Sequence, residues 1–401
     1  MKYAIILPDG AADQPVAALG HRTPLHAAHT PHMDWVADHG IIGLVRTTPD
    51  GYAPGSDVCT LSLMGVDVAR RHTGRAPLEA AGRGLELGPG DVVFRCNLVT
   101  IVDGCMVDFT AGHITQAHAG QLIAALNEQF HTDPVSFHEG VGYRHLMVVH
   151  DAAFGRCQCT PPHDIPHAPV VDHLPRGDQS SRVREIMDRA ARMLAEHPVN
   201  RRRLDGGQPP ANRIWLWGQG TRPGLDTWSR RFGLNCAGIA AVDLIRGIDR
   251  LLGFDLIDVP GATGYLDTDY AAKGRAAVAA LEDHDLVSVH VEAPDEAGHQ
   301  GDVEAKVAAI ERIDQAIVGP VLERLRSERT WGILVAPDHP TCLASRVHSA
   351  DPPPFAIALS RAATDPRTGG FCEPAARAGV FEPVGHQLIH RLIGPAAGDG
   401  A

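Results

Sequence analysis

The chain has 401 residues, of which 44% are hydrophobic, 21% charged and 5% aromatic, and its formal net charge is −12 at pH 7. This composition excludes a disordered chain, and at roughly 150 residues per domain the length predicts two domains. The negative charge and the lack of a run rich in Lys and Arg argue against nucleic acid as a partner.

No apolar stretch is as long as the 18 or so residues that a membrane-spanning helix needs, and the apolar run at residues 3–7 is too short for a signal peptide. We therefore expect a cytoplasmic protein with no membrane partner. Eight cysteines in such a chain indicate reduced thiols. Cys157 and Cys159 lack the further ligands that a closed zinc site needs.

Apolar runs and amphipathic repeats predict alternating strands and helices along the chain. In chain order they are a strand at 3–7, a strand at 92–102, a helix at 114–129, a strand at 146–149, and helices at 183–196 and 273–282, then a strand at 286–291, a helix at 303–326 and a strand at 332–336. This order predicts an α/β fold with a mostly parallel sheet. We expect a core domain of residues 1–85 and 210–401, and a smaller inserted α/β domain at 86–209.

An aspartate follows each of three predicted strands of the core, namely Asp9, Asp295 and Asp338. These strands are apolar on both faces, as in a parallel sheet that helices cover on both sides. Ligands of open α/β sheets bind beyond the carboxyl ends of the strands. We therefore expect the three carboxylates to converge on one crevice.

Histidines accompany these aspartates at short spacings. His299 follows Asp295 by four residues, which places both on one face of a helix. His339 is adjacent to Asp338 in a turn between two prolines, and His348 follows in the next loop. Mixed Asp and His ligands suit Mn²⁺, Zn²⁺, Co²⁺ or Mg²⁺, so the pattern predicts two divalent cations, with Mn²⁺ as the first choice.

A simpler interpretation exists for each residue taken alone. A strand-end aspartate commonly caps a helix, and a loop histidine commonly makes a structural hydrogen bond. Three acidic strand ends accompanied by three histidines favour the two-cation site over capping alone.

Ser56 follows Pro54 and Gly55 and begins a predicted helix, where backbone N–H groups favour an anion. One interpretation is an N-cap serine. The other is a nucleophile whose hydroxyl pKa a nearby cation lowers.

Together these motifs resemble the archaeal-type cofactor-independent phosphoglycerate mutases of the alkaline phosphatase superfamily. The resemblance runs through almost the whole chain and rests on Pro8-Asp9-Gly10, Pro54-Gly55-Ser56-Asp57-Val58, Thr73-Gly74-Arg75-Ala76-Pro77-Leu78-Glu79-Ala80-Ala81-Gly82, Asp108-Phe109-Thr110-Ala111-Gly112-His113-Ile114, Pro162-His163-Asp164-Ile165, Trp217-Gly218-Gln219-Gly220, Val242-Asp243-Leu244-Ile245-Arg246-Gly247-Ile248, Pro260-Gly261-Ala262-Thr263-Gly264-Tyr265 and Glu292-Ala293-Pro294-Asp295-Glu296-Ala297-Gly298-His299. Cys59-Thr60 and Cys342 depart from the family pattern.

The resemblance implies a three-layer α/β/α core and a role for each site residue. Ser56 would be the nucleophile of an isomerase that interconverts 3-phosphoglycerate and 2-phosphoglycerate through a phosphoserine, without 2,3-bisphosphoglycerate. One cation would be held by Asp295, His299 and His348, and the other by Asp9, Ser56, Asp338 and His339. The inserted domain would cover the substrate and exclude water.

A phosphoglycerate substrate also needs local positive charge on a negatively charged protein. Candidate substrate-binding residues within the family blocks, or near them, are Arg246, His163, Asp164, Arg144, His113 and Arg95.

Two alternatives remain at this point. The same scaffold could carry a related phosphotransferase or phosphatase activity, for instance one like homoserine kinase, because fold does not fix substrate. A catalytically silent metal-dependent binding protein is the other.

Overall fold

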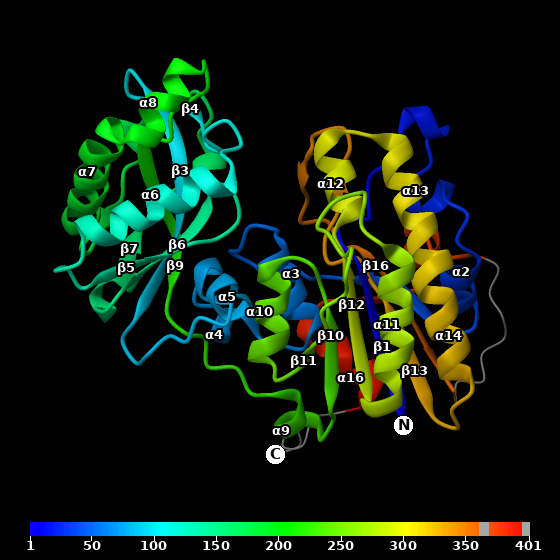
Figure 1. The fold of residues 1–401 in the computed structure, drawn as a ribbon. Coiled ribbons are helices and arrows are strands. Elements are labelled where there is room, and N and C mark those ends of the chain that lie inside the picture. The colour runs from blue at the N-terminus through cyan, green and yellow to red at the C-terminus, as the bar shows by residue number, and fades with distance from the viewer. Residues whose placement is uncertain (361–368, 395–401) are drawn as a thin grey trace. The chain divides into compact units, whose positions relative to one another are not determined.

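The computed structural model describes residues 1–360 and 369–394. The chain forms two compact units, each with its own sheet and core (Figure 1). Unit 1 comprises Met1–His72, Ala81–Arg83 and the chain from Gly224 onward, and unit 2 comprises Thr73–Ala80 and Gly84–Pro223.

An eight-stranded, mostly parallel sheet forms the centre of unit 1. Its strands, in spatial order, are β11 (Asp255–Leu256), β10 (Cys236–Ile239), β12 (Leu286–Val291), β1 (Lys2–Pro8), β13 (Trp331–Val335), β16 (Pro354–Leu359), β2 (Ile41–Val45) and β17 (Val380–Glu382). Only the pairs of β16 with its two neighbours are antiparallel among the described strands of this sheet. The predicted α/β class is confirmed.

Helices cover both faces of this sheet, which makes three layers. The main core lies between the sheet and α2 (Pro31–Asp38), α11 (Tyr270–Asp283), α13 (Val303–Ile313) and α14 (Gly319–Arg326). The remaining helices of unit 1 are α1 (Pro24–Ala27), α3 (Ser56–Leu63), α4 (Val68–Arg71), α9 (Trp228–Phe232), α10 (Asp243–Leu251), α12 (Ala293–Gln300), α15 (Glu373–Arg377) and α16 (Ile389–Ile393). On the other face, Leu392 of α16 packs beside Gly332 and Tyr3.

The helix predicted at 303–326 forms with one interruption. A π-helical segment, Asp314–Val318, separates α13 from α14. Pro320 has no N–H to donate to the preceding turn, so the regular hydrogen-bond ladder cannot continue there. The carboxylate of Asp314 accepts hydrogen bonds from the backbone N–H groups of His32 and Met33, which fixes this segment against α2.

Unit 2 contains an antiparallel five-stranded sheet. Its strands are β3 (Val92–Val102), β4 (Cys105–Asp108), β5 (Val135–His138), β6 (Arg144–Val149) and β9 (Arg213–Gly220), and β7 (Cys157–Gln158) pairs separately with β8 (Arg176–Gly177). The helices are α6 (Gln116–Gln129), α7 (Ser180–Glu196) and α8 (Pro198–Asp205), with α5 (Arg75–Gly82) shared between the units.

The observed division extends beyond the expected insertion at 86–209. Strand β9, which lies after residue 209, pairs with β3 from Val93 to Val99 and so belongs to the sheet of unit 2. Residues 73–80, before the expected start, also belong to this unit. Within the described residues, no helix is long and apolar enough to span a membrane.

Asp249 on α10 is a buried carboxyl that packs against strand β10. It is 1% exposed, and its Oδ2 atom lies 2.3 Å from the position that a Cβ at Gly238 would take. Burial raises the pKa of Asp249 to about 8, although Arg246 acts in the opposite direction. The folded state therefore holds a proton here that the unfolded chain releases near pH 4.

We predict that Asp249→Asn changes how stability depends on pH. Because the raised pKa favours the protonated folded state, the free energy of unfolding of the wild type should fall relative to the variant as pH rises. The expected slope is about 1.4 kcal/mol per pH unit, from the ordinary pKa of 3.8 up to about 8. Urea unfolding of both proteins across this range measures it, and parallel profiles would contradict the prediction.

Candidate cation and nucleophile site

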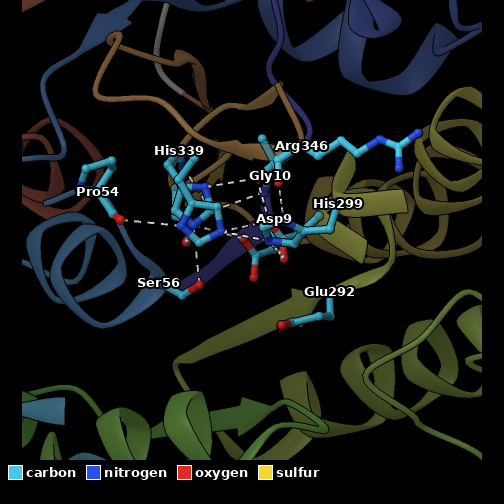
Figure 2. Close-up of polar contacts among 12 residues, drawn as sticks. Asp9, Gly10, Pro54, Ser56, Glu292, His299, His339 and Arg346 are labelled. Carbon is cyan, nitrogen blue, oxygen red and sulfur yellow. Dashed lines mark hydrogen bonds and ion pairs between the residues drawn. The ribbon is translucent and has the colours of Figure 1, made fainter. Parts of the chain in front are cut away.

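The three strands that these aspartates follow are neighbours in the sheet of unit 1, in the order β12, β1 and β13. All three run in parallel, so their carboxyl ends lie at one edge. The structure brings Asp9, Asp295 and Asp338 together at that edge. The described residues form three groups of possible metal ligands there, two of which share Asp9 (Figure 2).

The first group, here called the Asp295 cluster, consists of Asp295, His299 and His348. Asp295 and His299 lie one turn apart on α12, with Oδ2 and Nε2 at 3.3 Å. His348 lies on β15 (Val347–His348), which forms a hairpin with β14 (Thr341–Cys342), and its Nε2 is 3.3 Å from Asp295 Oδ1. The two Nε2 atoms are only 3.0 Å apart.

Backbone carbonyls orient both imidazoles of this cluster. The Nδ1 atom of His299 lies 2.9 Å from the carbonyl oxygen of Arg346, and that of His348 lies 3.3 Å from the carbonyl oxygen of Pro54 (Figure 2). A carbonyl only accepts, so it favours the tautomer with hydrogen on Nδ1. In that neutral tautomer the Nε2 lone pair is free to bind a cation beside Asp295, which is the arrangement that metal-binding histidines adopt.

Electrostatics in the Asp295 cluster favour charged groups. Burial acts to raise the pKa of Asp295, but hydrogen bonds from His299 and His348 outweigh it and hold this pKa well below its ordinary value. The same hydrogen bond from His299 to Asp295 raises the pKa of His299 to about 9, against the effect of burial. A proton therefore occupies this cluster at neutral pH until a cation displaces it.

The second group, here called the Asp9 cluster, consists of Asp9, Asp338 and His339, all fully buried. The Nε2 atom of His339 lies 3.5 Å from Asp9 Oδ1, 3.4 Å from Asp338 Oδ2 and 3.3 Å from the Oγ of Ser56. One nitrogen of the His339 ring thus faces two carboxylates and the hydroxyl of Ser56, the predicted nucleophile.

The surroundings of Asp9 oppose a negative charge on its carboxyl group. Neither of its carboxylate oxygens accepts a hydrogen bond within the described residues. Burial and the nearby carboxylates of Asp338, Glu292 and Asp295 raise its pKa well above the ordinary value. Burial also lowers the pKa of His339, which keeps that ring neutral. Orphaned carboxylate oxygens beside a neutral imidazole fit a hard or borderline divalent cation.

Two residues of the site were missed in the sequence. His290 and Glu292 form the third group with Asp9, and His290 Nε2 lies 3.1 Å from Asp9 Oδ2. His290 stands inside the fully buried strand β12, whose other residues are Leu, Val and Ser, and no spacing rule separates it from a core residue. Burial lowers the pKa of His290 to about 4.

Ser56 is the first residue of α3, as predicted, with Gly55 at the N-cap. Its side chain is buried among the site residues, where the helix N-terminus favours negative charge. One turn further along α3, the hydroxyl of Thr60 donates to Asp338 at 3.4 Å. The departure from the family pattern at position 60 therefore touches a candidate ligand.

The predicted substrate-binding residues are distributed over both units. Arg246 lies on α10 in unit 1, where its guanidinium pairs with Asp258 at 2.8 Å and reaches the carbonyl oxygen of Ala240.

Unit 2 brings three of the other candidates into a cluster of aromatic and basic side chains. The guanidinium of Arg95 lies 4.2 Å from the ring centre of Trp217, and His163 meets the same ring edge-on at 5.1 Å. Phe109 contacts both His163 and Tyr143, and Arg144 stacks over Tyr143. Arg95 also pairs with Glu79 at 3.1 Å.

The other two candidates of unit 2 are Asp164 and His113. Asp164 contacts His163 at 3.6 Å, whereas His113 lies in a tight turn after Thr110.

A mostly parallel sheet that gathers buried carboxylates, imidazoles and a serine at its strand ends defines an α/β protein with a candidate cation centre. Comparison with known proteins identifies the family. A profile of 2,3-bisphosphoglycerate-independent phosphoglycerate mutases matches residues 37–200. The mutase of that name from Methanothrix thermoacetophila is 49% identical over 98% of this chain and 100% of its own length. A probable one from Geobacter sulfurreducens is 47% identical with the same coverage.

Solved structures agree with this assignment. A cofactor-independent phosphoglycerate mutase from Thermoplasma acidophilum is 27% identical, with a TM-score of 0.66 and coverage of 98% of this chain and 99% of that one. A protein from Pyrococcus horikoshii is 29% identical with a TM-score of 0.83, and it covers 100% and 99% of the two chains. The chain belongs to the 2,3-bisphosphoglycerate-independent phosphoglycerate mutase family.

We predict that Asp9→Asn stabilises the metal-free protein. In EDTA at pH 8 burial and the neighbouring carboxylates oppose ionisation of Asp9 in the folded state but not in the unfolded chain. The substitution should therefore raise the free energy of unfolding by roughly 1–3 kcal/mol. Added Mn²⁺ should stabilise the wild type by mass action and the variant far less. Asp13→Asn is the matched control, because Asp13 pairs with Lys306 at 2.8 Å and its loss should destabilise the protein. A less stable Asp9→Asn variant in EDTA would show that Asp9 is already compensated.

Proposed function

We propose that this protein interconverts 3-phosphoglycerate and 2-phosphoglycerate through a phosphoserine on Ser56, without 2,3-bisphosphoglycerate. The observation that carries the proposal is the position of the Ser56 hydroxyl, 3.3 Å from the imidazole that faces two buried carboxylates. Family membership supports the same reaction, since the relatives are named as such mutases.

Two divalent cations, with Mn²⁺ as the first choice, complete the proposed site. The Asp295 cluster would hold one, and the Asp9 cluster with Ser56 would hold the other. The orphaned oxygens of Asp9 and the 3.0 Å approach of the His299 and His348 nitrogens support this assignment. When bound, divalent cations neutralise charge on a transferring phosphoryl group and lower the pKa of a hydroxyl they contact.

Ser56 performs the covalent chemistry in two transfers. Its Oγ attacks the phosphorus of 3-phosphoglycerate and loses its proton, the bond from phosphorus to the C3 oxygen breaks, and that oxygen takes up a proton. The C2 hydroxyl of the retained glycerate then attacks the phosphorus of the phosphoserine and loses its proton. The bond from phosphorus to Ser56 Oγ breaks and Oγ takes up a proton, which gives 2-phosphoglycerate and restores Ser56. Both transfers build negative charge at the N-terminus of α3, where the helix dipole favours it.

The glycerate carboxylate and hydroxyls need polar and basic partners. We assign this role to Arg95, Arg144, His163, Asp164 and His113 of unit 2, and a phosphate contact to Arg246 of unit 1. The aromatic side chains around Arg95, Arg144 and His163 support this assignment, because their rings contact these groups and hold them in place.

The shared name of the relatives favours the mutase over a phosphatase or a kinase-like phosphotransferase. We assign the enzyme to glycolysis and gluconeogenesis in the cytoplasm, where free cysteines such as the eight seen here are stable.

We predict that Ser56→Ala lowers mutase activity by several orders of magnitude, because the attacking oxygen is lost. The assay couples 2-phosphoglycerate formation to enolase, with Mn²⁺ present and 2,3-bisphosphoglycerate absent. Ser62→Ala, on the same helix and also buried, is the matched control and should stay active. Substantial turnover by Ser56→Ala would remove Ser56 from the role of nucleophile.

We also predict that labelled glycerate added during turnover does not enter the product, because the glycerate formed in the first transfer stays bound until the second. The label in purified 2-phosphoglycerate is measured by scintillation counting. Ready incorporation would mean that the acceptor exchanges with solution, and would favour the phosphatase or transferase alternative.

A further inference from the structure

Thr341 lies between the two candidate cation clusters and is fully buried. It follows His339 by two residues and begins β14. The Thr341 hydroxyl donates a short hydrogen bond to Oδ1 of Asp295. Its oxygen, Oγ1 of Thr341, also lies 3.3 Å from Nδ1 of His339. One side chain thus contacts a member of each cluster.

The chemistry of the three groups sets the direction of these hydrogen bonds. A carboxylate oxygen only accepts, so the single hydrogen of the Thr341 hydroxyl points to Asp295. The Thr341 oxygen then accepts from His339, whose ring hydrogen must lie on Nδ1. A neutral imidazole has one N–H, so Nε2 of His339 keeps its lone pair where it faces Ser56 and two carboxylates.

The backbone of Thr341 is held from several directions. Its carbonyl oxygen accepts from Lys306 Nζ at 2.6 Å, and its N–H donates to the carbonyl oxygen of Gly10 at 3.3 Å. It also pairs with His348 across the β14–β15 hairpin. These backbone contacts fix the position of the Thr341 hydroxyl, which is what a positioning group requires.

Two glycines of the sequence motifs make room for this residue. A Cβ at Gly10 would stand 2.6 Å from Thr341 Oγ1, and a Cβ at Gly298 would stand 2.6 Å from the Thr341 carbonyl oxygen. Gly10 follows Asp9, and Gly298 precedes His299, so each lies beside a candidate ligand. Both motifs are thus packed around Thr341.

We propose that Thr341 is a positioning residue that couples the two cation clusters, because one hydroxyl fixes the tautomer of His339 and orients the carboxylate of Asp295. This inference rests on the proposed function, in which both clusters hold cations. It requires that loss of the hydroxyl weaken both sites, although Thr341 itself binds neither cation.

The test compares Thr341→Val, which removes the hydroxyl and keeps the shape, with Thr341→Ser, which keeps the hydroxyl. Mn²⁺ binding to metal-free protein is followed by electron paramagnetic resonance. Thr341→Val should lose about 10–100-fold in affinity at both sites, as expected when a hydrogen-bond partner of a ligand is lost, and Thr341→Ser should bind nearly as the wild type does. Thr30→Val is the control, since it removes a buried hydroxyl that donates to Asp34, outside the three groups.

A loss confined to one site, or equal affinity of Thr341→Val and the wild type, would overturn the proposal. A wild type that binds fewer than two Mn²⁺ ions would instead overturn the proposed two-cation site.

A second measurement needs no variant. Nitrogen-15 NMR of the metal-free wild type at pH 8 reports which ring nitrogen of His339 carries the hydrogen, and hydrogen on Nδ1 is expected. Hydrogen on Nε2 would overturn the proposal whatever the number of bound cations.

Discussion

Mutual repulsion among buried carboxylates is the constraint on which the site depends. Asp9, Asp295 and Asp338 converge because three parallel strands end side by side, and Glu292 lies close enough to raise the pKa of Asp9 further. Folding brings these charges out of water and next to one another, which costs free energy unless positive charge joins them. Imidazoles fill part of this role, and divalent cations would fill the rest.

The surrounding structure holds these ligands in place without neutralising them. The chain has only three lysines, and two of them, Lys273 and Lys306, are buried in unit 1. Lys306 donates to Asp13, to the carbonyl oxygen of Ala12 and to that of Thr341, so its three N–H groups join the segment after β1 to the segment after β13. A compact ammonium with three donors suits this position better than the planar guanidinium of arginine.

Sequence reasoning found the strand ends that carry the candidate ligands because the signals there are local. An apolar run followed by an aspartate identifies a strand end, and the spacing of Asp295 and His299 identifies one helix face. The extent of unit 2 depends instead on the pairing of β9 with β3, two strands more than one hundred residues apart along the chain, and no local pattern shows it. His290 and Thr341 were missed for a related reason, since each is an ordinary strand residue until the fold places it beside a carboxylate.

The central claim is that the two clusters each hold a divalent cation beside Ser56. Crystals of the protein loaded with Mn²⁺, measured on both sides of the manganese absorption edge, test it most directly. The account predicts two anomalous peaks, one bounded by Asp295, His299 and His348 and the other by Asp9, Asp338 and His339. A single peak, or peaks that contact neither set of side chains, would contradict it.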